Sequence, residues 1–285
     1  MGLIDFILNL AGLLLWFNWR AARSDPLART TAASLVGTLR RAKTSRLLRW
    51  LSLVALFGLV CGRALFYLLL GPAVEWTANL NLGAITLFFR TDQFWLILLF
   101  SALSFVRALA LVYFWLLAVS IINRNAAATD VVCRLIRQQL NRVTAWPIYV
   151  QLALPVLFVT AVWPGLHALL SYSKITGPLP SLGPLLLQGC LIGLGIYFSL
   201  KYLIPALLVA DLIAGYIYFG SSPFWDFLST TARNTLAPLN HLPLRVGKVD
   251  FAPLVGIILT LLLLHVLPGL VLLELHKRNL TLWPQ

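Results

Sequence analysis

The chain has 285 residues, of which 60% are hydrophobic and 11% charged, and its net charge at neutral pH is +13. Its mean hydropathy is +0.88. Soluble proteins carry about a quarter charged residues, so this composition excludes a soluble globular protein and indicates an integral membrane protein. The three cysteines are scattered and form no CxxC pair, which excludes a disulfide framework and covalent haem attachment.

Six apolar stretches are long enough to cross a bilayer, whose hydrocarbon core needs about 20 helical residues. The sequence therefore predicts an all-α membrane protein with six transmembrane helices. The fifth stretch is too long for one straight span, so we expect Pro205 to kink it or its cytoplasmic end to project from the bilayer. The stretches are residues 3–19, 47–70, 94–122, 145–170, 184–219 and 251–273.

The orientation follows from the distribution of Lys and Arg between the loops. Fifteen of them lie in residues 20–49, 123–144 and 220–250, whereas only four lie in the loops and ends on the other side. Because positive loops stay in the cytoplasm, we expect three basic cytoplasmic loops and both termini outside. The N-terminus has no basic region and no small-residue cleavage site, so we expect the first span to be a retained anchor.

Each basic loop carries the pattern of a short amphipathic helix, starting at Asp25-Pro26, after Thr129 and at Ser222-Pro223. We expect these helices to lie in the headgroup layer, with apolar residues inward and arginines toward anionic lipid. An alternative is that they are simple basic loops that happen to be helical. The second helix would have a stripe of Val132, Leu135, Ile136, Leu140 and Val143, and the third one of Phe224, Phe227, Leu228, Thr231 and Thr235. The basic residues expected to face lipid are Arg40, Arg41, Arg134 and Arg137.

The order of span, amphipathic helix and span recurs, which predicts three repeat units in residues 1–75, 94–172 and 183–275. Each unit has two spans, so the units share one orientation and form a parallel repeat. Each unit also ends in a predicted break, at Gly71-Pro72, Pro164-Gly165 and Pro268-Gly269. The outer loop at residues 76–93 is apolar, so we expect it to lie on the membrane or on a partner.

The third unit resembles a known family. Ser222-Pro223-Phe224 is followed by Pro238, and then by Gly247, Asp250 and Pro253 before the last span. This order resembles the YggT family of small bacterial and plastid membrane proteins, and the match covers residues 222–254. The first unit repeats part of it in Asp25-Pro26-Leu27 and Leu39-Arg40-Arg41. This chain would be a distant or expanded member, because typical members hold two units.

The resemblance implies a bacterial cytoplasmic membrane protein without catalytic activity. Members are linked to osmotic tolerance, cell division and assembly of a haem-containing electron-transfer complex in plastids, which implies a scaffold or assembly factor. The motif residues suit structural roles. Ser222 would cap the surface helix that Pro223 starts and Pro238 stops, Phe224 would enter the acyl boundary, Gly247 would allow a tight turn, and Asp250 would cap the last span.

Four ionisable residues lie within apolar stretches: Arg63, Arg107, Lys201 and Asp211. A charge near the bilayer centre costs about 2.5 to 3.5 kcal/mol, so each needs a partner, a wet cavity or a route to the interface. We expect Asp211 to be the only acid buried in a span, and pairing it with Arg107 or Lys201 would remove the cost. Alternatively, Arg63 and Lys201 snorkel and Asp211 faces the cytoplasmic interface.

The sequence offers little for catalysis or cofactors. No phosphate-binding loop, dinucleotide fingerprint, zinc motif or nucleophilic triad is present, so we expect no enzyme and no metal site. His167 and His265 lie near the outer ends of two spans and could ligate a haem between them, although hydrogen-bonded interface roles are commoner. The basic loops lack interleaved stacking aromatics, so we expect no nucleic-acid binding.

Two functions remain after these exclusions. The first is a non-catalytic membrane scaffold or assembly subunit that binds partner membrane proteins and anionic lipid. The alternative is a transport or ion-homeostasis protein that uses the interior charges as its site.

Overall fold

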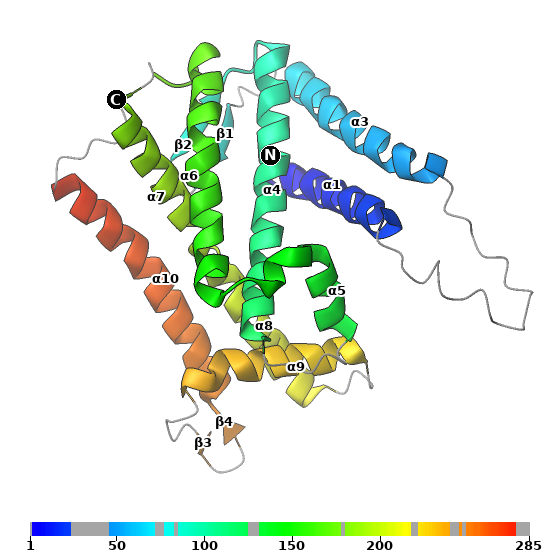
Figure 1. The fold of residues 1–285 in the computed structure, drawn as a ribbon, viewed down its shortest axis with the longest axis vertical. Helices are drawn as coiled ribbons and strands as arrows, with labels where there is room; N and C mark the ends of the chain where they lie inside the picture. Colours follow the sequence, from blue (N-terminus) through cyan, green and yellow to red (C-terminus); the bar gives the residue numbers. More distant parts are fainter. Residues whose placement is uncertain are drawn as a thin grey trace, which may run out of the picture. The chain divides into compact units, whose positions relative to one another are not determined.

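The computed structural model describes residues 2–23, 46–71, 77–82, 85–124, 131–177, 180–217, 222–239, 245–246 and 249–277. These residues are mainly helical (Figure 1). They belong to two compact units, one of residues 1–80 and 86–110 and the other of residues 81–85 and 111–285. The helix predicted at Asp25-Pro26, and with it Arg40 and Arg41, lies outside the described residues.

Five stretches of helix in the described residues are long and apolar enough to cross a membrane, which confirms an α-helical membrane protein. They lie in α1 (Gly2–Arg23), α3 (Arg46–Leu70), α4 (Phe94–Ile122), α6 (Ile148–Tyr172) and the pair α7 (Leu182–Tyr197) and α8 (Leu200–Tyr216). The expected sixth stretch forms α10 (Ala252–Lys277), of which residues 252–267 are a shorter apolar helix among those described.

The fifth apolar stretch is broken before its proline. Between α7 and α8 the N–H of Ser199 bonds to the carbonyl of Ile196, and that of Tyr202 to Ser199, so one turn tightens to 3₁₀ geometry. The Ser199 hydroxyl also accepts a hydrogen bond from Trp115 Nε1 at 3.0 Å. Pro205 lies inside α8, so the kink expected there occurs instead at Phe198 and Ser199.

The first unit contains α1, α3 and the start of α4, with α1 and α3 packed side by side (Figure 1). Strands β1 (Ala78–Asn81) and β2 (Thr86–Phe89) pair in a two-stranded sheet. Alternate strand residues, including Leu80, Leu87 and Phe89, are buried. The loop was expected to lie on the membrane or on a partner. Period-two burial instead places one side of it, with these large residues, in the protein core, while Phe88 on the other side is 65% exposed.

In the second unit, α6 and α7 pack unusually closely. A Cβ atom added at Gly189 or Gly193 would lie 2.8 Å from the Cα of Thr160 or Val156, so only glycine allows this approach. Two of the predicted breaks are wrong: α6 continues through Pro164 and Gly165, and α10 through Pro268 and Gly269. Proline is tolerated within membrane helices because neighbouring groups can satisfy the freed carbonyls.

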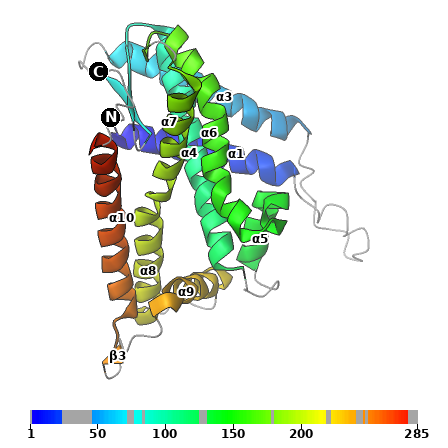
Figure 2. The same ribbon diagram turned by 60° about the vertical axis from the view of Figure 1, so that its left-hand side comes forward.

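Two short helices pack on the ends of these spans. They are α5 (Val131–Leu140), continued by η2 (Asn141–Ala145), and α9 (Pro223–Leu236), continued by η3 (Ala237–Leu239). Helix α9 lies crosswise to α8 and α10 and packs against both (Figure 2). Beyond it, β3 (Arg245–Val246) and β4 (Val249–Asp250) pair antiparallel, with Arg245 opposite Asp250.

The apolar faces of α5 and α9 are covered by protein, contrary to the expectation that they face the acyl layer. Cys133, Ile136 and Leu140 of α5 join Phe227 of α9 in one buried cluster with the end of α4. Leu135, predicted in the inward stripe, is 54% exposed. The spacing of the apolar residues correctly predicted that these two helices are amphipathic. It did not distinguish lipid from a neighbouring span as the cover of the apolar face.

Candidate functional site

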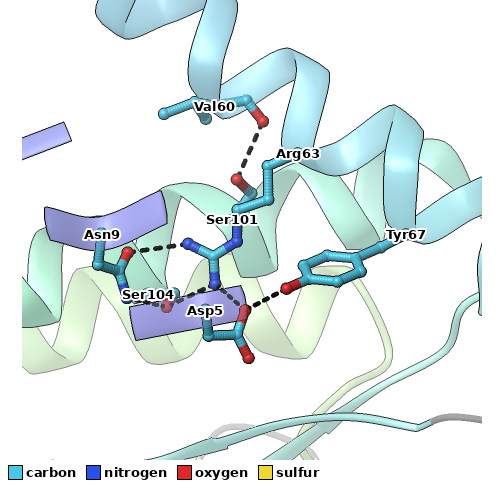
Figure 3. A network of polar contacts seen from close by, with 7 residues as sticks. All are labelled: Asp5, Asn9, Val60, Arg63, Tyr67, Ser101 and Ser104. Atoms are coloured by element: carbon cyan, nitrogen blue, oxygen red, sulfur yellow. Dashed lines mark hydrogen bonds and ion pairs between the residues drawn. The ribbon is translucent and has the colours of Figure 1, made fainter. Parts of the chain in front are cut away.

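The best-defined polar cluster in the described residues surrounds Arg63 on α3 (Figure 3). Its side chain is 1% exposed and forms an ion pair with Asp5 on α1, with 2.5 Å between Nη2 and Oδ1. Arg63 Nη1 also donates to Asn9 Oδ1 at 2.8 Å, and Nη2 to the Ser104 hydroxyl at 2.9 Å. Thus the guanidinium connects α1, α3 and α4.

Helical spacing explains how each helix contributes to this cluster. Residues three or four positions apart lie on one helix face, as Asp5 and Asn9 do on α1 and Arg63 and Tyr67 on α3. The Tyr67 hydroxyl donates to the same Asp5 oxygen at 2.5 Å. Asn9 Nδ2 donates to Ser104 at 3.2 Å, which closes the network between α1 and α4.

The expectation that Asp211 is the only acid buried in a span is wrong, because Asp5 lies within the span formed by α1. The Asp5 side chain is 23% exposed and compensates the Arg63 charge inside the first unit. Arg63 therefore does not snorkel to the interface, because it has a partner of opposite charge within the protein. Its Nε has no hydrogen-bond partner among the described residues, and its guanidinium carbon lies 5.4 Å from the Phe100 ring centre.

Within the second unit, Lys201 and Asp211 do not form the ion pair that was one of the two expected pairings. Asp211 Oδ1 accepts a hydrogen bond from Ser229 of α9 at 2.7 Å. Lys201 shares α8 with Asp211, but ten residues of helix separate them by about 15 Å along the axis; its ammonium lies 5.1 Å from the Tyr202 ring centre. Arg107 is exposed on α4.

A second buried cluster, which the sequence analysis did not identify, attaches α9 to the end of α4. Asn123 Nδ2 donates to the Thr231 hydroxyl at 2.7 Å, and Asn234 Nδ2 donates to Asn123 Oδ1 at 2.9 Å. Asn123 is 2% exposed and Thr231 is fully buried. An uncharged Asn at the edge of an apolar stretch gave no signal, because its partners lie more than a hundred residues away.

The residues of the family-like motif that the structure describes lie at or beside the ends of helices. Ser222 is the N-cap of α9 without a side-chain cap bond, Pro223 is its first residue and Phe224 is 51% exposed. Pro238 lies in η3, after the last residue of α9, and Pro253 is the second residue of α10. Gly247 and the Asp250 side chain lie outside the described part of the chain.

The two described basic candidates, Arg134 and Arg137, lie on α5. Arg134 is exposed. Arg137 is half-buried and lines a shallow hollow with Ser120 and Asn123, so it lies at the edge of the packed face and not opposite to it. This hollow is too small to enclose a water molecule.

The two histidines considered for haem have different surroundings. His167 on α6 is buried with its ring 5.9 Å from that of Trp163, whose Nε1 donates to Gln188 on α7 at 3.2 Å. His265 on α10 is exposed. Within the described ranges, no three His, Cys, Asp or Glu side chains are grouped closely enough to hold a metal ion.

Comparison with known proteins does not extend this description. No protein-family model matches the chain, and neither curated proteins nor solved structures include a detectable match.

Proposed function

We propose that this chain is a non-catalytic membrane scaffold or assembly subunit, which binds partner membrane proteins through its spans and meets the headgroup layer near α5 and α9. The observation that carries this proposal is that the buried charge of Arg63 is bound by neighbouring helices of the same chain. Arg63 is held by Asp5, Asn9 and Ser104 from two other helices. A transport site needs charged groups left for the solute, whereas this group connects the helices of its own unit.

The topology proposed with this function has six spans, with α10 as the last, both termini outside and the basic loops in a bacterial cytoplasmic membrane. The 26-residue length of α10 and the bias of basic residues toward three loops support it. The order of span, surface helix and span in α4–α5–α6 and in α8–α9–α10 supports the repeat and a distant relationship to the YggT family.

The spans also have extensive apolar surface outside the packed core. On α3, Phe57 is 70% exposed and Leu69 is 76% exposed. Gly58 and Gly62 lie on the same helix with no atom within 4 Å of an added Cβ. Since small residues let helix backbones approach closely in a bilayer, this side of α3 is a suitable place to test for a partner helix.

The test is cross-linking mass spectrometry on protein extracted gently from its native membrane. We expect a stoichiometric membrane-protein partner. The variant Gly58→Leu/Gly62→Leu should lower its recovery, whereas neutralising Lys201 and Asp211 together should not. If only the chain itself is recovered, and charge reversal at Asp211 abolishes solute flux in liposomes, the scaffold proposal is wrong and the transport alternative is correct.

A further inference from the structure

Four arginines gather where the span α4 ends. Arg124 follows the last turn of α4, Arg134 and Arg137 lie on α5, and Arg142 lies in η2. None of the four forms an ion pair with a carboxylate of a described residue. A cluster of positive charge at the end of a transmembrane helix attracts anions from the adjoining headgroup layer.

One of these arginines lies beside polar groups of α4. Arg137 lines the hollow together with Ser120 and Asn123, and Val119, Cys133 and Ile136 form its apolar part. Asn123 is engaged by Thr231 and Asn234. The Ser120 hydroxyl and the Arg137 guanidinium form no hydrogen bond with a described residue, so two donors remain for an oxyanion.

The outward side of α5 indicates where the anion comes from. Val131 is 52% exposed and Leu135 is 54% exposed, and both lie on the helix side that carries Arg134. Trp146, directly after η2, is 41% exposed, and Tyr149 in the first turn of α6 is 82% exposed. Aliphatic, aromatic and arginine side chains together suit the boundary of acyl chains and headgroups better than free phosphate in water.

We propose that the corner between α4 and α5 is a headgroup site for an anionic phospholipid. The phosphate lies against the rim of the hollow, which is too small to enclose it, and its oxygens there meet Arg137 and Ser120. Arg134, one turn away on α5, adds a second positive charge. The hydrogen bonds of Asn123 to α9 hold the end of α4 in place for this site. This inference deepens the proposed function, because it rests on the placement of α5 at the membrane surface and names the lipid class bound there.

Native mass spectrometry tests the site on the full chain, purified in detergent with equal amounts of phosphatidylglycerol and phosphatidylcholine. We expect the wild type to retain phosphatidylglycerol preferentially. Replacing both Arg134 and Arg137 by Gln should lower this preference by about thirtyfold, which is about fivefold for each surface arginine. The variant R134K/R137K should keep most of it, because it preserves both charges.

The matched control is R90Q/K174Q, which removes the same charge from exposed residues near the opposite ends of α4 and α6. It should leave the preference unchanged. Equal losses in the two Gln variants would show an effect of net charge alone and overturn the site, as would no loss in either. Displacement of the lipid by inorganic phosphate would identify a free-anion site instead. If the wild type shows no preference for phosphatidylglycerol while the partner is still cross-linked, this site is rejected but the scaffold is not.

Discussion

Replacing Asp5 by Ala should destabilise the first unit by leaving the Arg63 charge buried without its counter-charge. Removing one partner of a buried ion pair typically costs about 3 to 5 kcal/mol. The Asp5 side chain is 23% exposed, and Arg63 keeps its bonds to Asn9 and Ser104. Both facts favour the lower end of this range, so we expect a loss of about 3 kcal/mol in the free energy of unfolding.

The double variant Asp5→Leu/Arg63→Met separates the ion pair from the packing around it. Apolar residues of similar volume can replace a buried pair with little cost, since two desolvation penalties disappear together with the attraction. We therefore expect the double variant to unfold within about 1 kcal/mol of the wild type and the two single changes to be strongly non-additive. Asn9→Ala should cost only about 0.6 kcal/mol, the average for a side-chain hydrogen bond between membrane helices.

The assay is reversible unfolding in mixed micelles with increasing sodium dodecyl sulfate, followed by circular dichroism. Arg90→Gln is the control, because Arg90 and Asp92 form an ion pair with both side chains more than half exposed. It should change stability by less than about 0.5 kcal/mol. If Asp5→Ala costs no more than this control, or if the double variant loses as much as the single changes combined, the buried pair does not hold the helices together as argued.

Three further predictions concern packing in the second unit and its surface helices. Gly193→Ala should destabilise by about 1 to 3 kcal/mol, because the new Cβ meets the α6 backbone, whereas Gly62→Ala should be neutral or slightly stabilising; thermal unfolding in detergent compares them. Asn123→Ala should cost about 1 to 3 kcal/mol by removing one buried and one part-buried hydrogen bond, and faster amide exchange in α9 would report it. Phe227→Ala should cost about 3 kcal/mol because Phe227 is buried, whereas Phe224→Ala should change stability by less than about 0.5 kcal/mol, and equal losses in denaturant titrations would contradict this assignment.

The spans were the most predictable part of the chain, because hydropathy over about 20 residues averages many small contributions. The third predicted stretch, residues 94–122, coincides with α4. The position of the kink in the fifth stretch was less predictable. Proline removes a local backbone bond, but the helix bends where another element stabilises the bent backbone, here at Ser199 through Trp115.

Amphipathic faces were recognised more reliably than the medium that covers them. In α5, the period of the apolar residues predicts a helix with one buried side, and Ile136 and Leu140 are buried. The sequence does not distinguish burial in lipid from burial against α4, because both remove the same side chains from water. The same ambiguity affected the outer loop, where alternation over four residues was too short a signal to predict the paired strands.

The candidate site illustrates a further limit that concerns charges in membranes. The cost of a charge in the bilayer predicted that Arg63 needs a partner, a wet cavity or a route to the interface. That reasoning identifies the residue, but neither the choice among the three nor the helix that supplies the acid. Asp5 lies 58 residues away and near an end of α1, where an acid is inexpensive and draws little attention. The useful signal was the spacing of Asp5 and Asn9, which are four residues apart and so place two acceptors on one face of a short span. A span with an otherwise apolar face and two such acceptors requires donors from a neighbouring helix, and Arg63 with Tyr67 is the matching donor pair on α3.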